Sequence, residues 1–257
     1  MALTVGAQLY TVREYTKTIE GVAETFRKIK DIGYQAVQIS GFGPVDYKQV
    51  GKLAKETGLD VAATHVGWKR FREELDAVIE EHQCWECKHA AIGGLPADYH
   101  TEEGLKKFID ELAPISEKLA AAGLDFSYHN HNNEFKRYGD TGKTWLEMLY
   151  ESAPADMLKA ELDVYWVTAG GGSPATWIKK LGKRQPLVHF KDMTITPERE
   201  QHFAPVGKGN LDWPAIIDAC RQVDAQYALV EQDNAYGADP FAELAASYRF
   251  LTESGLS

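Results

Sequence analysis

Two histidines and a nearby glutamate give the segment Tyr128–Phe135 the capacity for chemistry. The residues before it resemble a loop that enters a short strand. Side chains alternate between the two faces of a strand, so His129 and His131 are expected to project in the same direction. Two such imidazoles, with Glu134 just beyond them, can hold a divalent metal ion or move protons. The segment alone is equally compatible with a polar strand end whose histidines are solvated.

Side chains that can bind a metal also lie at the ends of three later apolar runs, at Asp163, His189 and Glu231. Acids and imidazoles near a buried sheet are costly unless they are paired or bound to a metal. With His129 they form a mixed set that suits Mn²⁺, Co²⁺, Fe²⁺, Mg²⁺ or Zn²⁺ without a strong choice among them. Any one of the four could be an independent polar strand end, since Asp163 could cap a loop and His189 could be a core histidine. The four together favour a metal site.

Eight short apolar runs, each followed by a longer amphipathic segment, must position these side chains. The predicted strands lie near residues 5–9, 36–39, 61–65, 89–92, 126–130, 160–163, 187–190 and 227–231. The predicted helices lie near residues 19–31, 45–57, 71–83, 101–122, 141–152, 174–181, 213–222 and 240–252. Strands that alternate with helices pair in parallel through crossover connections. Eight such units in about 250 residues predict one α/β domain over residues 1–257, a (β/α)8 TIM barrel with its reactive groups at the carboxyl ends of the strands.

An open, doubly wound sheet is the alternative architecture. Such a sheet usually carries a glycine-rich phosphate turn after its first strand, and the segment Gln8–Arg13 is not one. Two later glycine-rich segments, Gly170–Gly172 and Gly207–Asn210, could present backbone N–H groups to an anion. Tight connections between elements are the more common role of such segments, so they do not establish that a substrate is phosphorylated.

Five motifs together resemble the xylose-isomerase-like barrel superfamily, in the branch of sugar phosphate isomerases and epimerases. They are Gly6–Arg13, Tyr128–Phe135, Glu161–Trp166, His189–Met193 and Gly207–Trp213. The resemblance covers essentially the whole chain, but these motifs say little about which substrate is bound. The branch with a His-Asn-His strand end is similar to enzymes that act on keto-sugars and keto-inositols such as inosose, including dehydratases and lyases of 3-keto-glycosides.

The resemblance implies a metal held by a Glu after the fifth strand, an Asp after the sixth, a His after the seventh and a Glu after the eighth. Asp163, His189 and Glu231 match the last three positions. The first position departs from the family pattern because His129 stands there. Either His129 binds the metal, which we favour, or Glu134 reaches back from the loop and His129 is free for proton transfer. Mn²⁺ is the favoured ion.

The chemistry implied by the resemblance is removal of a proton from a carbon beside a carbonyl, through an enediolate. Glu231 would act as a ligand and as a base on one face, and His131 or Glu134 would act on the other. Return of the proton to carbon gives an isomerase or epimerase, whereas departure of a β-oxygen gives a lyase or dehydratase. The expected substrate-binding residues are Gln8, His65, Trp166 and Lys191. Ketose epimerases carry a histidine at the position of Trp166, which suggests stacking on a sugar face here.

The net charge of −10 leaves the chain without the basic face that nucleic-acid binding requires. This argues against a DNA-repair endonuclease, which shares the barrel but needs additional zinc-binding histidines. Two non-catalytic alternatives remain. One is a metal-free sugar-binding module, and the other is a subunit of a complex that has lost catalysis. The departure at His129 keeps the second alternative open.

The remaining features of the sequence do not point to a further chemical activity. No apolar run approaches the length of a membrane span, and Met1–Val5 does not begin an export signal, so we expect a cytoplasmic protein with no membrane partner. Cys84 and Cys87 form a lone CxxC without the second pair that a zinc site needs, and they predict structural thiols. Aromatics expected on outer helices, Tyr150 and Trp177, leave both a homo-oligomer and a monomer open.

Overall fold

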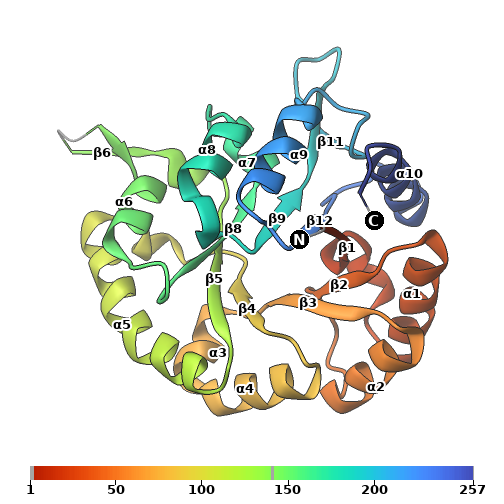
Figure 1. The fold of residues 1–257 in the computed structure, drawn as a ribbon, viewed down its shortest axis with the longest axis horizontal. Helices are drawn as coiled ribbons and strands as arrows, with labels where there is room; N and C mark the ends of the chain where they lie inside the picture. Colours follow the sequence, from red (N-terminus) through yellow and green to blue (C-terminus); the bar gives the residue numbers. More distant parts are fainter. Residues whose placement is uncertain (1–2, 140–141, 257) are drawn as a thin grey trace.

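Eight parallel strands close into a barrel, and helices surround it (Figure 1). The computed structural model describes residues 3–139 and 142–256. Around the barrel the strands follow the order β1-β12-β9-β8-β5-β4-β3-β2. Helical crossovers join neighbouring strands, except that β1 and β12, the first and last strands of the chain, pair directly and close the barrel. This arrangement confirms the predicted single-domain TIM barrel. The predicted helix start at residue 141 and the ends of the predicted domain, at residues 1–2 and 257, lie outside the described residues.

The barrel strands lie close to their predicted positions. Their bounds are β1 Thr4–Gln8, β2 Ala36–Ile39, β3 Asp60–His65, β4 His89–Ile92, β5 Asp125–His129, β8 Lys159–Asp163, β9 Leu187–Phe190 and β12 Tyr227–Val230. Two antiparallel hairpins were not predicted. One pairs β6 Arg137–Tyr138 with β7 Lys143–Thr144, and the other pairs β10 Asp192–Ile195 with β11 Gln201–Ala204.

The helices follow the predicted alternation with two additions. Their bounds are α1 Ile19–Ile32, α2 Tyr47–Thr57, α3 Trp68–Glu73, α4 Leu75–Cys84, α5 Glu102–Ala121, α6 Trp145–Ser152, α7 Val164–Ala169, α8 Pro174–Leu181, α9 Trp213–Gln222 and α10 Pro240–Glu253. The segment predicted as one helix near residues 71–83 is two helices, because the backbone leaves helical geometry at Glu74, where φ is −134°. The second addition is α7, which begins directly after β8.

Local sequence explains where several helices begin and end. Thr18 accepts a hydrogen bond from Gly21 N–H before α1, and Thr144 forms a capping box with Glu147 before α6. Gly33 follows α1 with a φ of 122°, a backbone conformation that residues with a Cβ rarely adopt. The buried face of α1 carries Val22, Phe26 and Ile29 at helical spacing, which fixes this helix against the barrel.

Small and branched apolar side chains close the barrel interior below its polar mouth. Leu187 and Leu229 are fully buried and pack with Ala36 and Ala63 in one cluster. Gly6 lies on β1 where an added Cβ would come within 2.8 Å of a Leu229 methyl carbon. The residue at this position therefore has to be small, and the polar side chains at the strand ends rest on a packed apolar layer.

Some expectations about the surface need correction. Tyr150 and Trp177 are both only 8% exposed, so they belong to the packed shell and say nothing about oligomerisation. Cys87 is buried, and burial raises the pKa of its thiol to about 12, as suits a structural thiol. Cys84 is half-buried, and both thiols are free. Among the described residues, no helix combines the length and the apolar character that crossing a membrane would need.

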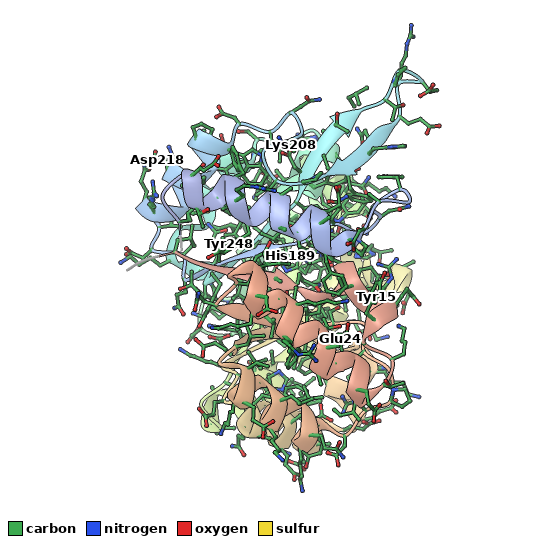
Figure 2. The ribbon with its side chains drawn as sticks, turned by 90° about the vertical axis from the view of Figure 1, so that its right-hand side faces the viewer. Tyr15, Glu24, His189, Lys208, Asp218 and Tyr248 are labelled. Atoms are coloured by element: carbon green, nitrogen blue, oxygen red, sulfur yellow. The ribbon has the colours of Figure 1, made fainter. Side chains whose placement is uncertain are left out.

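The β10–β11 hairpin projects from the body of the protein (light cyan in Figure 2) and is anchored by one carboxylate. Asp192 is fully buried and accepts hydrogen bonds from Gly207 N–H at 2.9 Å, Gly209 N–H at 3.0 Å and the indole N–H of Trp213 at 2.6 Å. The backbone N–H groups of Met193 and Leu211 also donate to it. The loop considered above for phosphate therefore has two of its N–H groups committed to Asp192.

We expect Asp192→Asn to destabilise the fold by about 3 kcal/mol, because its amide N–H₂ would face donors that then lose their acceptor. Denaturant unfolding followed by circular dichroism measures this loss. Asp212→Asn is the matched control, since asparagine caps a helix as well as aspartate does and Asp212 only caps α9. Equal stability of the two variants would contradict the anchoring role.

Candidate active site

The carboxyl ends of four neighbouring strands bring the predicted metal ligands together. The pairing register places Asp163 beside His189 on β8 and β9, and β5 and β12 flank this pair. His129 ends β5, and Glu231 directly follows β12. His129 and Glu231 are 2% and 4% exposed, and Asp163 and His189 are fully buried. Figure 2 shows His189 in the interior of the molecule.

These four side chains form a compact set of ligand atoms. One atom from each lies within 4.8 Å of every other. His189 Nδ1 lies 2.9 Å from Glu231 Oε2 and 3.9 Å from Asp163 Oδ2, and His129 Nε2 lies 4.0 Å from Asp163 Oδ2. Two imidazoles and two carboxylates fit a divalent metal ion of the kind that the sequence predicts.

Glu161 is a further member of the site that the sequence argument did not single out. It is fully buried two residues before Asp163 on β8, and its Oε1 contacts His189 Nε2 closely. It also accepts a hydrogen bond from Gln38 Nε2 at 2.6 Å. His189 thus has one ring nitrogen toward the candidate ligand set and the other held by a carboxylate, an arrangement that fixes the orientation of a metal-binding histidine. The sequence contained a signal for Glu161, because residues two apart on a strand share a face and Glu161 lies two residues before Asp163.

A second, overlapping group of four donors shares two residues with the first. His65, His129, Glu161 and His189 also hold ligand atoms within 4.8 Å of one another. His65 Nε2 lies 3.2 Å from Glu161 Oε1. Asp163 and Glu231 supply two carboxylates in the first group, whereas Glu161 supplies one carboxylate in the second. The first group carries more negative charge and therefore fits a divalent cation better.

The electrostatics of the buried cluster match a cation site. Burial raises the pKa of Asp163 to about 6, despite the opposing charge of Lys191. Burial alone would lower the pKa of His189, but Glu161 and Glu231 raise it to about 10. In the metal-free protein a proton on His189 therefore compensates these carboxylates. A divalent cation in place of that proton would compensate the same charges.

Lys191 supplies the other positive charge of the cluster. It is 1% exposed, and its Nζ lies 2.7 Å from Glu231 Oε2, 2.9 Å from Asp233 Oδ1 and 3.2 Å from Asp163 Oδ2. Burial opposes its charge, but these three carboxylates raise the pKa of the ammonium. Lys191 is therefore a fixed cation at the edge of the candidate metal site, surrounded by three carboxylates.

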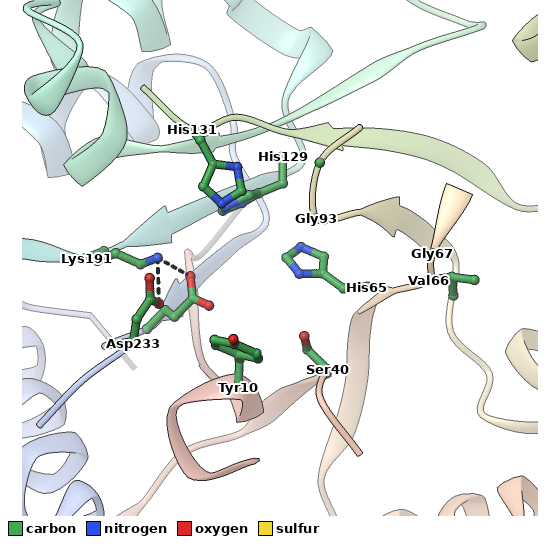
Figure 3. A pocket seen from close by; sticks show the side chains of 12 residues that line it. Tyr10, Ser40, His65, Val66, Gly67, Gly93, His129, His131, Lys191 and Asp233 are labelled. Carbon is green, nitrogen blue, oxygen red and sulfur yellow. Dashed lines mark ion pairs between the residues drawn. The ribbon is translucent and has the colours of Figure 1, made fainter. Parts of the chain in front are cut away.

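A cavity of about 420 Å³ opens above this cluster (Figure 3). Its lining includes His65, His129, His131, Lys191, Glu231 and Asp233. Figure 3 shows both strand-end histidines on one side, Lys191 and Asp233 on another, and Tyr10 across from the histidines. Five of the predicted site residues therefore meet at one cavity, while Asp163 and His189 lie behind its lining. Tyr10 and Asp233 were not among the predicted site residues.

His131 and Glu134, the two candidates for the second acid/base, lie in different surroundings. The His131 ring lies 5.0 Å from that of His129, and burial lowers its pKa. Glu134 is 1% exposed and does not line the cavity. Its oxygens accept hydrogen bonds from Tyr128 Oη at 2.8 Å and from His131 N–H at 2.9 Å. This placement favours His131 for proton transfer and gives Glu134 contacts that hold the His131 loop.

Two predicted substrate-binding residues, Gln8 and Trp166, do not line the cavity. Gln8 is fully buried, its Oε1 accepts a hydrogen bond from Tyr10 N–H at 2.6 Å, and its Nε2 lies 3.4 Å from His65 Nδ1. Trp166 packs against the His131 ring at 5.3 Å, and Lys191 Nζ lies 5.5 Å from the indole centroid. Both therefore contact residues of the cavity. A direct contact with a substrate stays a prediction for each.

Comparisons with known proteins agree with this architecture. The profile of a family described as xylose isomerase-like TIM barrel matches residues 26–254. The structure is similar to that of a sugar phosphate isomerase/epimerase from Parabacteroides distasonis, with a TM-score of 0.82, 22% identity and 98% of each chain covered.

Two further solved structures share the fold. A D-allulose 3-epimerase from Methylomonas sp. in complex with D-allulose has a TM-score of 0.75 and 15% identity, with 98% of this chain and 97% of that chain covered. A probable 3-DHS dehydratase from Bacillus anthracis has a TM-score of 0.70 and 14% identity, with 97% and 99% covered. No curated protein matches the chain.

We expect Asp163→Asn to weaken binding of Mn²⁺ at least a hundredfold, because a neutral amide replaces a buried carboxylate while the cap of α7 is kept. Calorimetric titration measures the affinity, and the melting temperature with and without a chelator gives a second readout. His202→Ala, in the β10–β11 hairpin and outside both groups of candidate ligands, is the control and should bind as the unchanged protein does. Unaltered binding in Asp163→Asn would remove this residue from the metal site.

We expect Glu161→Gln to lower the metal affinity by about tenfold to a hundredfold, the usual effect of losing a carboxylate behind a histidine ligand. One equivalent of metal should still bind, as elemental analysis at saturating metal would report. Complete loss of binding would instead make Glu161 a ligand, in the second donor group. No change would show that Glu161 does not position His189.

Proposed function

Because this chain belongs to the xylose isomerase-like TIM barrel family, we propose that it is a divalent-metal-dependent sugar isomerase or epimerase. The reaction removes a proton from a carbon beside a carbonyl and passes through an enediolate. His129, Asp163, His189 and Glu231 would hold the ion, and Mn²⁺ is the preferred candidate. One observation carries the proposal. The buried set of candidate ligands borders a polar cavity, and His131 and Lys191, which are not members of that set, also line the cavity.

The C–H group that must lose its proton is a weak acid, and this is the central difficulty of such a reaction. A bound divalent cation supplies Lewis acidity, which lowers the pKa of a C–H beside a carbonyl. Lys191 adds a second positive charge close to the oxygen that would become negative. Because it is 1% exposed, this charge acts with little screening by water.

Two groups can move the proton. Burial lowers the pKa of His131, so this imidazole is neutral near pH 7 and can accept a proton. Burial opposes ionisation of Glu231, but Lys191 and His189 lower its pKa and keep it ionised. His131 and Glu231 reach the cavity from the segments that follow β5 and β12. A proton removed by one group could return from the other, which is what epimerisation requires.

A sugar is the substrate class that this cavity suits best. It combines imidazole, carboxylate, ammonium and hydroxyl groups with the exposed ring of Tyr10, which is 38% accessible. Polar groups that fix hydroxyls and an aromatic face for ring C–H groups are what a carbohydrate needs. His65 and Lys191 are the residues best placed to contact substrate oxygens. The fold relatives named above as isomerase, epimerase and dehydratase support this class of chemistry.

The outcome after proton removal separates the proposal from its alternative, a lyase or dehydratase. Return of the proton to carbon conserves the sugar, whereas loss of a β-oxygen leaves a double bond. A non-catalytic sugar-binding protein or complex subunit is the alternative of a different class. It predicts that no hydrogen at carbon exchanges with solvent under any metal condition.

We expect the Mn²⁺-loaded protein to exchange a carbon-bound hydrogen of a keto-sugar with solvent deuterium. His131→Ala should lower this rate at least a hundredfold while metal affinity stays within about threefold, because His131 is placed to move the proton and not to bind the ion. Proton NMR in D₂O over a panel of keto-sugars and inosose measures exchange, and the same spectra report epimers and elimination products.

His202→Ala is again the matched control and should exchange at the unchanged rate. Exchange that survives in His131→Ala would assign the proton transfer to another group. Failure of the metal-loaded protein to exchange any member of the panel would favour the non-catalytic alternative.

A further inference from the structure

A second chamber of about 280 Å³ adjoins the active-site cavity. The two share Ser40, His65, Val66 and Gly67 as common walls. In Figure 3 these residues lie on the side of the cavity that faces away from Lys191 and Asp233. We call this second space the outer chamber. It is bounded by the segment after β2, by α2 and by α3 and α4, so it lies beyond the group of metal-binding and proton-transfer residues.

Aromatic side chains form one part of the outer chamber. Tyr47 and Trp85 line it, with ring centroids 6.5 Å apart and an interplanar angle of 78°. The indole N–H of Trp85 donates to the carbonyl oxygen of Tyr47 at 2.8 Å, which fixes the indole orientation. Phe42 adds a third aromatic side chain. Rigid aromatic faces of this kind can pack against the C–H groups of a sugar ring.

An ion pair between Arg70 and Glu81 forms the polar part of the same chamber. Arg70 donates to both carboxylate oxygens of Glu81, at 3.0 Å and 2.8 Å, and its Nε donates to Glu74 at 2.9 Å. The Arg70 side chain is 36% exposed and that of Glu81 is 15% exposed. The pair presents hydrogen-bonding groups of both kinds at a fixed place. Because two carboxylates offset the charge of Arg70, this lining suits the hydroxyl groups of a neutral ring better than a phosphate.

We propose that the outer chamber binds the second ring of a disaccharide or other glycoside whose carbonyl-bearing sugar occupies the metal site. This inference rests on the proposed function, since it requires a keto-sugar in the first cavity, and it narrows the substrate to one with an uncharged ring attached. The two spaces border the same four residues, and the proposal requires one ligand to reach past these residues into both. The aromatic and ion-paired lining matches the two kinds of surface that a sugar ring presents.

Gly67 offers a way to obstruct the connection between the two spaces. It directly precedes α3 with a φ of −63°, a conformation open to every residue, and a Cβ added there meets no atom within 4 Å. Gly67→Phe should therefore fold and place a ring where a linked substrate would pass. Gly67→Ala is the matched control, because it changes the backbone entropy similarly and fills little space.

The test compares D-fructose, a one-ring ketose, with turanose, lactulose, leucrose and isomaltulose, which carry a second ring on different oxygens of fructose. Dissociation constants come from rapid-mixing titration of tryptophan fluorescence in the Mn²⁺-loaded protein. We expect at least one disaccharide to bind tenfold or more tightly than D-fructose. Gly67→Phe should reduce this ratio to within about twofold of unity, and Gly67→Ala should preserve it.

Arg70→Met gives a second, independent variant that removes the guanidinium and keeps much of the length of the side chain. It should lower the affinity of the preferred disaccharide at least fivefold and leave that of D-fructose within twofold. Equal affinity for one and two rings in the unchanged protein, or a ratio that Gly67→Phe does not alter, would overturn the inference. So would absence of binding by every probe.

Metal binding and deuterium exchange of one-ring keto-sugars, measured on the same preparation, keep the two proposals apart. If both are present while the second ring adds no affinity, the outer-chamber proposal fails and the proposed function stands. If metal binding and exchange are both absent, the proposed function fails as well.

Discussion

The negative charge of buried carboxylates has to be compensated, and the arrangement of side chains at the mouth of this barrel depends on that constraint. Glu161 and Asp163 are fully buried, and Glu231 is 4% exposed a short distance away. Carboxylates removed from water are stable only when opposite charge and hydrogen bonds replace the lost solvation. In the metal-free protein Lys191 and a protonated His189 supply that charge. The same concentration of negative charge is what makes the site suitable for a divalent cation.

Contacts among neighbouring strands hold these charges in register. Asn130 Oδ1 accepts a hydrogen bond from Asp163 N–H at 3.0 Å, which ties the end of β5 to the end of β8. Gln38 reaches across the barrel, donating to Glu161 at 2.6 Å and accepting from His189 Nε2 at 2.7 Å. Such polar links orient the residues around a candidate metal without contributing ligands. The apolar layer of Leu187 and Leu229 below them excludes water from this side.

The fold places the candidate chemistry and the proposed second sugar site on different segments of the chain. Candidate ligands and proton-transfer groups come from β5, β8, β9 and β12, whereas the outer chamber is built by the segments that follow β2 and β3. Loops on a rigid barrel can change without disturbing the strand ends.

The sequence by itself determined the architecture and the list of candidate ligands. Strand and helix periods are local, and parallel strands in a closed barrel must present their carboxyl ends at one mouth. Asp163, His189 and Glu231 could therefore be grouped from their places at the ends of predicted strands. Tertiary structure alone decided how each side chain is used. Glu134 faces Tyr128 and the backbone instead of the cavity, and Gln8 turns back to cap its own loop.

The same limit applies to Glu161 and to the outer chamber. The strand period puts Glu161 on the face of Asp163, but only the packing across the barrel shows that it holds His189. The outer chamber requires Tyr47, Arg70 and Trp85, which come from three separate helices or their ends. Contacts between residues far apart in sequence depend on how loops and helices pack around the strands. No local pattern of residues specifies that packing.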